Sequence, residues 1–362
     1  MTATSASPWR KNLGRALLLC VLSALLIACE TVAYYSQAAR GQLQILMARE
    51  EIHALLATGD LDPRLRAKLE LVLAARQFAS EEIGLPAGEN YLSYVDLERE
   101  HAVWNVFAAP EFSVDPLTWC YPIAGCVAYR GYFSESGAIG YAKRLEDDGY
   151  DVYLGGVDAF STLGWFDDPL FSTVINRSDT QLAGLIFHEL AHQLLYVPGD
   201  TTFNESFATV VEREGMRRWL EGAGADPDTE PALRQNDYQR QFVELVLNYR
   251  EQFTNLYREN LAAGQMRQRK QALQDAMRSD YESLKMAWSG YSGYDAWFAG
   301  SLNNAQLSTV GSYNDLVAGM EVVLREEDGD LDRFYGRMQA LSELDMDARH
   351  GELAVSAPGD GG

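Results

Sequence analysis

The spacing of hydrophobic residues predicts that both ends of the chain are helical. Between residues 33 and about 84, apolar positions recur at three- and four-residue intervals, which is the period of an amphipathic helix. The segment TGDLDP, residues 58–63, interrupts this pattern, so we expect a second helix to begin near Pro63. Helical patterning resumes at about residue 234 and continues to about residue 344.

A long helical hairpin is expected within this C-terminal part. Residues 234–286 contain no proline and a single glycine, Gly264, near which we expect the chain to turn. The heptad repeat is imperfect here, which favours an intramolecular helix pair over a coiled-coil site for a partner. The final residues, 354–362, are expected to be disordered.

The middle of the chain has a different pattern. From about residue 91 to residue 165, short runs of β-branched and aromatic residues such as AVWNVFAA and GYDVYLGGV are separated by glycines, which is typical of strands. Helical patterning follows over about 179–222. We therefore expect one α+β domain, mostly helical, spanning residues 29–353 and containing a small antiparallel sheet.

One predicted helix carries a candidate metal site. In RSDTQLAGLIFHELAHQLLYVPGD, residues 177–200, Ser178 and Gln181 fit a capping box at the start, and PGD ends the helix. His188 and His192 are one turn apart on one face, so both rings can bind a single ion. Glu189 is offset by about 100° and can flank the water of that ion. This is the HExxH arrangement of zinc hydrolases.

HExxH also occurs by chance in helices that bind nothing. Here, however, apolar residues cover most of the helix, and charged side chains are rarely buried without partners. A cation would satisfy both histidines and the glutamate. Zinc would then lower the pKa of its bound water, and Glu189 would accept the proton as general base.

The N-terminus predicts export. Residues 1–28 begin with basic residues and end in the apolar run ALLLCVLSALLIA, which is short for a membrane span and typical of a secretory signal. LIAC, ending at Cys29, resembles the bacterial lipobox, in which the cysteine is acylated. A plain signal peptide is the alternative. Because Glu30 and not aspartate follows, we expect a lipid anchor at the periplasmic face of the outer membrane.

The net charge excludes one class of function, and the cysteines predict a disulfide. The net charge of −22 and the lack of a basic stripe exclude nucleic-acid binding. In an oxidising compartment, Cys120 and Cys126 are expected to form a disulfide, since no further thiol ligands lie near them for a metal.

Several segments together resemble the predicted zinc aminopeptidases of Gram-negative bacteria. These segments are CETVAYYSQAARGQ, WCYPIAGCVAYRGYF, GGVDAFSTLGWFDDP, FHELAHQ, FNESFA and LNNAQLSTVGSY. The NESFATVVE segment is also similar to the third-ligand segment of gluzincin aminopeptidases, which implies Glu205 as third ligand, although Thr202 and Glu205 could instead form only a capping box. Asn204 and Glu212 would support the ligands, with an ordinary salt bridge as the alternative for Glu212. The link from His192 to Glu205 is shorter than in gluzincins.

The resemblance also implies how a peptide would be held. Gly155 and Gly156 lie in a strand expected to pair with substrate, and Asp158 is the candidate for binding the α-amine, with a loop-capping role as the alternative. For the oxyanion-stabilising tyrosine we choose Tyr313 ahead of Tyr291 and Tyr294.

The expected function is a peptidase, most simply an aminopeptidase, with one Zn²⁺ ion. It would hydrolyse peptide bonds through a zinc-bound water, with a zincin-type HExxH helix beside the small sheet. Two alternatives stay open: an envelope scaffold lipoprotein with a structural zinc site, and a zinc hydrolase of a non-peptide amide. An unligated glutamate beside the metal has no use in a purely structural site, which favours an enzyme.

Overall fold

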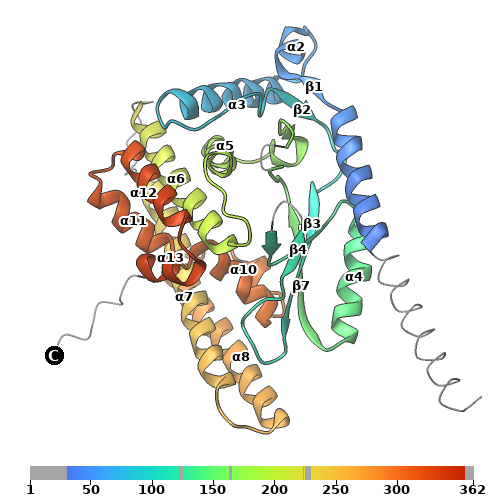
Figure 1. Cartoon of the computed structure of the whole chain (residues 1–362), viewed down its shortest axis with the longest axis vertical. Coiled ribbons are helices and arrows are strands. Elements are labelled where there is room, and N and C mark those ends of the chain that lie inside the picture. The colour runs from blue at the N-terminus through green and yellow to red at the C-terminus, as the bar shows by residue number, and fades with distance from the viewer. Residues whose placement is uncertain (1–30, 122–124, 163–164, 223, 225–229, 355–362) are drawn as a thin grey trace, which may run out of the picture. The chain divides into compact units, whose positions relative to one another are not determined.

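A computed structural model describes residues 31–121, 125–162, 165–222, 224 and 230–354, without the side chains of residues 230–236 and 312–313 (Figure 1). The predicted signal peptide, Cys29 and residues 355–362 of the predicted disordered tail lie outside this description. The chain divides into two compact units, Met1–Ala48 and Arg49–Gly362. In the first unit, residues 31–47 form a helix.

The second unit is mostly helical, which confirms the predicted α+β class. Its helices are α2 (Ile52–Ala57), α3 (Pro63–Glu81), α4 (Glu135–Asp147), α5 (Asp179–Leu194), α6 (Thr201–Gly222), α7 (Glu230–Tyr257), α8 (Ala263–Ala287), α9 (Asp295–Phe298), α10 (Asn304–Asn314), α11 (Val317–Glu326), α12 (Leu331–Ser342) and α13 (Met346–Leu353), with a 3₁₀ turn at Ser172–Val174. Its strands are β1 (Glu50–Glu51), β2 (Ser93–Val95), β3 (Val103–Pro110), β4 (Trp119–Tyr121), β5 (Gly125–Val127), β6 (Arg130–Tyr132), β7 (Tyr150–Val157) and β8 (Leu170–Phe171).

The main sheet is antiparallel and has the order β6-β3-β7. The long β3–β7 pairing runs from Val103↔Val157 to Pro110↔Tyr150. Helices α4 and α10 both pack against β3 and β7, on opposite sides of the sheet (Figure 1). This explains why β3 is buried along both faces, while β7 is the edge strand of the sheet.

A second small sheet, with the order β1-β2-β8, was not predicted, and its β2–β8 pair is parallel. The pairing joins Tyr94 to Leu170 and Val95 to Phe171, which are far apart in sequence. Strands of two or three residues leave too short a pattern to be recognised along the chain.

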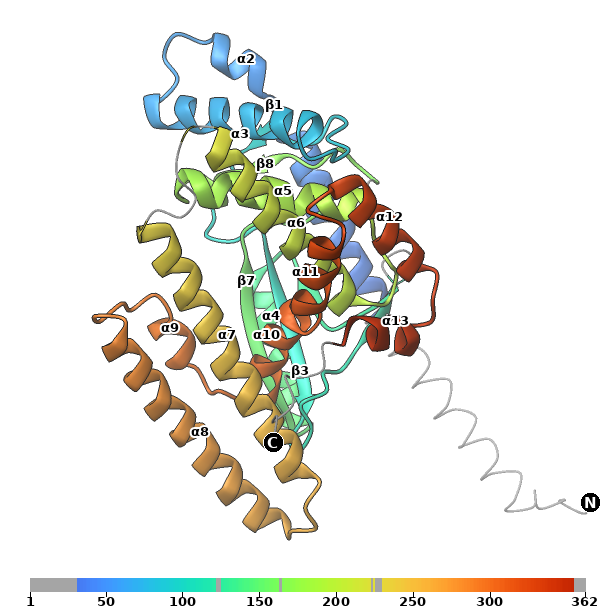
Figure 2. The same cartoon turned by 90° about the vertical axis from the view of Figure 1, so that its left-hand side faces the viewer.

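Helices α7 and α8 form the predicted long hairpin (Figure 2). The turn between them covers residues 258–262, so Gly264 lies in the first turn of α8 and not at the bend. Aromatic residues fill the space between the hairpin and α9, with Tyr281 and Phe298 stacked at 3.9 Å and Phe242 and Tyr294 stacked at 4.1 Å between ring centroids.

Helix α5 lies at the centre of the main hydrophobic core, as its nearly continuous apolar surface requires. It packs against α3 and α6, and Phe187 contacts the rings of Phe78 and Trp219. The predicted capping box is present: Ser178 Oγ accepts from Gln181 N, and Gln181 Oε1 accepts from Ser178 N. The start of the motif helix is therefore fixed by its own side chains.

Candidate metal centre

The structure brings together the three predicted metal ligands from α5 and α6. His188 Nε2 lies 3.3 Å from Glu205 Oε2, and His192 Nε2 lies 3.7 Å from the same oxygen. The donor atoms of the three residues all lie within 4.8 Å of one another. The tight α5–α6 packing places Glu205, the fifth residue of α6, opposite both histidines.

This donor set fits a metal ion such as zinc. Two ligands of a tetrahedral zinc ion, each about 2.1 Å from it, lie roughly 3.4 Å apart, close to the two nitrogen–oxygen distances. Burial alone would raise the pKa of Glu205, but His192 and His188 lower it to about 2, so the carboxylate stays ionised. Burial alone would lower the pKa of His188, yet Glu205 and Glu212 raise it well above its usual value. The carboxylates thus favour positive charge at this position.

Of the two further residues named from the sequence, Glu212 contacts this group, whereas Asn204 contacts the connection that precedes α6. Glu212 Oε2 lies 3.1 Å from His188 Nδ1, and the absence of a side chain at Gly184 leaves room for the Glu212 carboxylate. A carboxylate on the second ring nitrogen fixes the orientation of a metal-binding histidine. Asn204 is buried and bonds the connection before α6, donating to Val197 O at 2.9 Å and accepting from Val197 N at 2.8 Å.

Glu189 follows His188 on α5, where the turn of the helix points it about 100° away. Burial raises the pKa of Glu189, while the positive charges of His188 and His192 act in the opposite direction. A carboxyl in this position can flank the ion and exchange protons with a bound water.

Tyr91 and Asp168 are neighbours of Glu189 that the sequence did not indicate. Tyr91 is buried in a left-handed conformation with φ of 59°, which is unusual for a bulky residue, and its N–H donates to Asp168 O at 2.7 Å. Burial, and then the charges of Glu189 and Asp168, raise the pKa of Tyr91 well above its usual value. No local motif joins residues 91, 168 and 189, so only the fold reveals the group.

Gln193, directly after His192, connects α5 to the loop that follows β7. Its amide donates to Ser161 Oγ at 2.7 Å, and Asp168 accepts from Thr162 N at 3.0 Å and from Ser161 Oγ at 3.0 Å. The loop between β7 and β8 is therefore bonded to the end of α5 that carries the candidate metal ligands.

The predicted substrate-binding residues lie at the end of β7. Gly155 and Gly156 are in this edge strand, but a Cβ on Gly156 would collide with the ring of His101. Asp158 accepts from His101 Nδ1 at 2.8 Å and from Arg177 Nη2 at 3.1 Å. The Asp158 carboxylate thus already contacts two side chains of the protein. Its role in binding an amine stays a prediction.

Of the tyrosines considered, Tyr313 lies in α10, which packs against α6, but its side chain is not among those described. Tyr291 and Tyr294 belong instead to the aromatic cluster of the hairpin. Tyr196, in the connection from α5 to α6, was not predicted. Burial, with a contribution from the charge of Glu205, raises the pKa of Tyr196 to about 12.

The predicted disulfide between Cys120 and Cys126 is present and joins β4 to β5. This hairpin touches the connection from α5 to α6: a Cβ on Gly125, whose φ is +72°, would lie 2.5 Å from Gly199 N. The hairpin therefore supports the segment that leads to Glu205.

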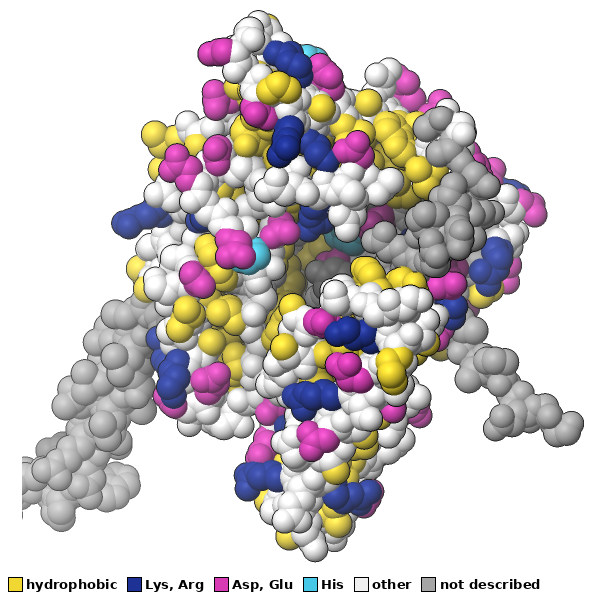
Figure 3. Space-filling model, turned by 180° about the vertical axis from the view of Figure 1, so that it is seen from behind, with side chains coloured by type: hydrophobic (Ala, Val, Ile, Leu, Met, Phe, Trp, Pro, Cys, Tyr) yellow, Lys and Arg dark blue, Asp and Glu magenta, His cyan; other side chains and the backbone are white. Residues whose placement is uncertain are grey.

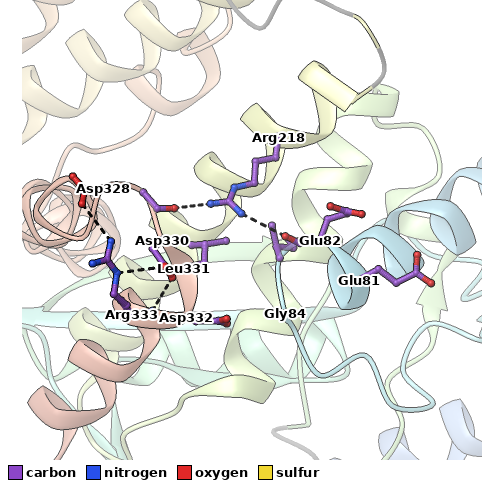
Figure 4. Close-up of a pocket in the computed structure, with 11 residues that line it drawn as sticks. Glu81, Glu82, Gly84, Arg218, Asp328, Asp330, Leu331, Asp332 and Arg333 are labelled. Carbon is purple, nitrogen blue, oxygen red and sulfur yellow. Dashed lines mark hydrogen bonds and ion pairs between the residues drawn. The ribbon is translucent and has the colours of Figure 1, made fainter.

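A pocket elsewhere in the second unit contains none of these residues. It lies between the end of α3, α6 and the turn from α11 to α12, with acidic residues and two arginines around it (Figure 4). Arg218 joins α6 to the turn before α12 by donating to Gly329 O at 2.6 Å, while Arg333 pairs with Asp330 at 3.3 Å within the start of α12.

Charged side chains of both signs are scattered over the face shown in Figure 3, where they alternate with apolar ones. Among the described residues, no helix is long and apolar enough to cross a membrane.

A family model described as putative aminopeptidase matches residues 33–353, which include the whole metal centre. Searches of curated proteins and of solved structures find no match. The match confirms the resemblance to an aminopeptidase family that the motifs indicated. Since it covers most of the sequence, the chain belongs to this putative aminopeptidase family.

Proposed function

We propose that this protein is a zinc-dependent metallopeptidase and that it acts as an aminopeptidase. The observation that carries the proposal is the convergence of His188 Nε2, His192 Nε2 and Glu205 Oε2 within 4.8 Å, with Glu189 beside them on α5. Membership of the aminopeptidase family supports a peptide as substrate.

In this proposal His188, His192 and Glu205 hold the ion, and Glu212 orients His188. When bound, zinc lowers the pKa of a coordinated water and polarises the scissile carbonyl. Glu189 accepts a proton from the attacking water and then donates it to the leaving amine. Because Glu189 is on the buried helix α5, the position of its carboxylate relative to the attacking water is fixed.

The edge strand β7 provides a place for the peptide backbone. Its outer side is free of strand pairing in the described sheet, so an extended peptide can add to it as a further strand. Asp158, at the end of β7, is our candidate for the group that binds the α-amine. Tyr313 and Tyr196 are the candidate donors to the developing oxyanion.

We also propose that the protein is exported and anchored through lipid on Cys29, at the periplasmic face of the outer membrane. The signal-like residues 1–28 and the lipobox-like LIAC support this location. The Cys120–Cys126 disulfide is consistent with an oxidising compartment.

The test compares hydrolysis of peptides with free and with acetylated N-termini by zinc-loaded protein, with Glu189→Gln as the blank. Cleavage of free N-termini alone supports an aminopeptidase. Cleavage of both kinds of peptide points to an endopeptidase, and cleavage of neither contradicts the proposed peptidase function.

A further inference from the structure

The start of α6 is held by residues from the far end of the chain. The side chain of Asp200, which directly precedes α6, is 1% exposed. One of its oxygens, Oδ1, accepts from Phe203 N at 3.0 Å and thereby caps α6. The other, Oδ2, accepts from Arg349 Nε at 2.9 Å. Arg349 Nη2 lies 2.7 Å from Oδ2 as an ion pair, and His350 Nε2 lies 2.9 Å from it.

Arg349 is itself buried, with a side chain 4% exposed, and it makes further bonds beside those to Asp200. Its Nη1 donates to Ser342 O at 3.1 Å and to Leu344 O at 2.8 Å, which joins α13 to the end of α12. The guanidinium also lies 5.2 Å from the centroid of the Phe203 ring. Arg349 and Asp200 thus form a buried ion pair that joins α13 to the first turn of α6.

Glu205 lies only five residues after Asp200. Residues 197–205 are connected by the Asn204–Val197 bonds, by the Asp200 cap and by Asn204 N donating to Asp200 O at 3.1 Å. A shift of Asp200 would therefore be transmitted to the backbone that carries Glu205. Metal sites depend on ligand positions to within a few tenths of an ångström.

We propose that Arg349 is a positioning residue for the metal ligand Glu205 and that it acts through Asp200. Helix α13 would then help to fix the geometry of the metal centre, although it supplies no ligand. The inference rests on the proposed function, since it requires that Glu205 binds metal. Removing Arg349 would leave Asp200 as a buried charge with no arginine or lysine paired to it among the described residues, and with the His350 ring as its remaining side-chain neighbour. Such a charge must regain water, and the nearest way is to open the first turn of α6.

The test measures zinc affinity by competition with a chromophoric chelator, using full-length wild type, Arg349→Ala and Arg349→Lys. We expect Arg349→Ala to weaken zinc binding by about 10- to 100-fold, as is typical for groups that orient ligands. Arg349→Lys should recover part of the affinity, because an ammonium restores the charge but not the two-pronged contact. The absorption spectrum of cobalt-substituted protein should change in Arg349→Ala, since it reports the position of Glu205.

Lys270→Ala is the matched control. Lys270 is also buried and pairs with Asp151 at 2.5 Å, which joins α8 to β7, and it donates to Glu111 O at 2.8 Å. Neither of these partners lies in α6. We expect this variant to lose thermal stability while keeping wild-type zinc affinity and cobalt spectrum. If Arg349→Ala and Lys270→Ala bind zinc equally well, the positioning role is wrong.

If Arg349→Ala does not fold, His350→Ala is the alternative variant. The His350 side chain is 32% exposed, so its removal should destabilise the fold less than removal of the buried Arg349 side chain. His350→Ala should weaken zinc binding less than Arg349→Ala. Wild-type affinity in both His350→Ala and Arg349→Lys overturns the inference. Wild-type protein that binds no zinc overturns the proposed function itself, whatever the variants do.

Discussion

Glu212 offers the sharpest test of how the metal centre is organised. Its carboxylate lies 3.1 Å from His188 Nδ1, while its side chain is 38% exposed. We expect Glu212→Ala to weaken zinc binding by about 10- to 100-fold. That range corresponds to roughly 1.4–2.7 kcal/mol and agrees with the roughly 1.5–3 kcal/mol of a hydrogen bond to a charged group. Partial exposure favours the lower half of this range, because solvent screens the contact.

The free energy of unfolding of the metal-free protein should fall by about 1 kcal/mol in Glu212→Ala, because the hydrogen bond to His188 is lost there as well. Glu212→Gln keeps an acceptor for Nδ1 but loses the charge, so it should bind zinc with intermediate affinity. The assay is chelator competition for zinc, with urea unfolding of metal-free protein to measure stability.

The matched control is Glu221→Ala. Glu221 lies on the same helix, is 49% exposed and pairs with Arg217 at 2.5 Å, far along α6 from the ligands. Its replacement should leave zinc affinity unchanged. If Glu212→Ala binds zinc as tightly as Glu221→Ala does, the Glu212–His188 contact is an ordinary ion pair and our reasoning is refuted.

Three further substitutions test other parts of the structure. Glu189→Gln should keep full zinc content and lower kcat by about 100- to 10,000-fold; activity near that of wild type would exclude the general-base role. Gly125→Ala places a Cβ 2.5 Å from Gly199 N and should destabilise the fold by more than Gly149→Ala, where φ is also positive but no atom lies within 4 Å; equal melting temperatures would contradict this. Phe187→Ala opens a cavity in the core beside His188 and should lower the free energy of unfolding by about 3–5 kcal/mol, measured in urea; a loss below 1 kcal/mol would mean that the core is not packed as described.

Much of the motif helix could be predicted because its signals are local. Ser178 and Gln181 define its start, and His188 and His192 share a face because a helix turns once every four residues or so. The disulfide was predictable for a similar reason, since its cysteines are six residues apart. The long hairpin followed from an uninterrupted helical pattern, although its turn ends before Gly264.

Other features depend on contacts that no local pattern records. The parallel β2–β8 pair joins segments about 75 residues apart, and Asp200 meets Arg349 across 149 positions. Tyr91, Asp168 and Glu189 come from three separate segments, and they are neighbours only because α5, which carries Glu189, is buried in the core that includes Tyr91. Asp158 was predicted to bind an amine or to cap a loop, and only the fold shows that it contacts His101 and Arg177.

The sequence by itself determined the helical character of the chain, the two histidines and glutamate on one helix, and the chemistry that these side chains can perform. Helix periodicity and capping depend on residues that are close in the chain, so they can be recognised from the sequence alone. Only the tertiary structure decided that Glu205 faces both histidines, that Glu212 reaches His188, and that α13 holds the start of α6. Those arrangements arise from the packing of helices around one core, which depends on side chains distant in sequence.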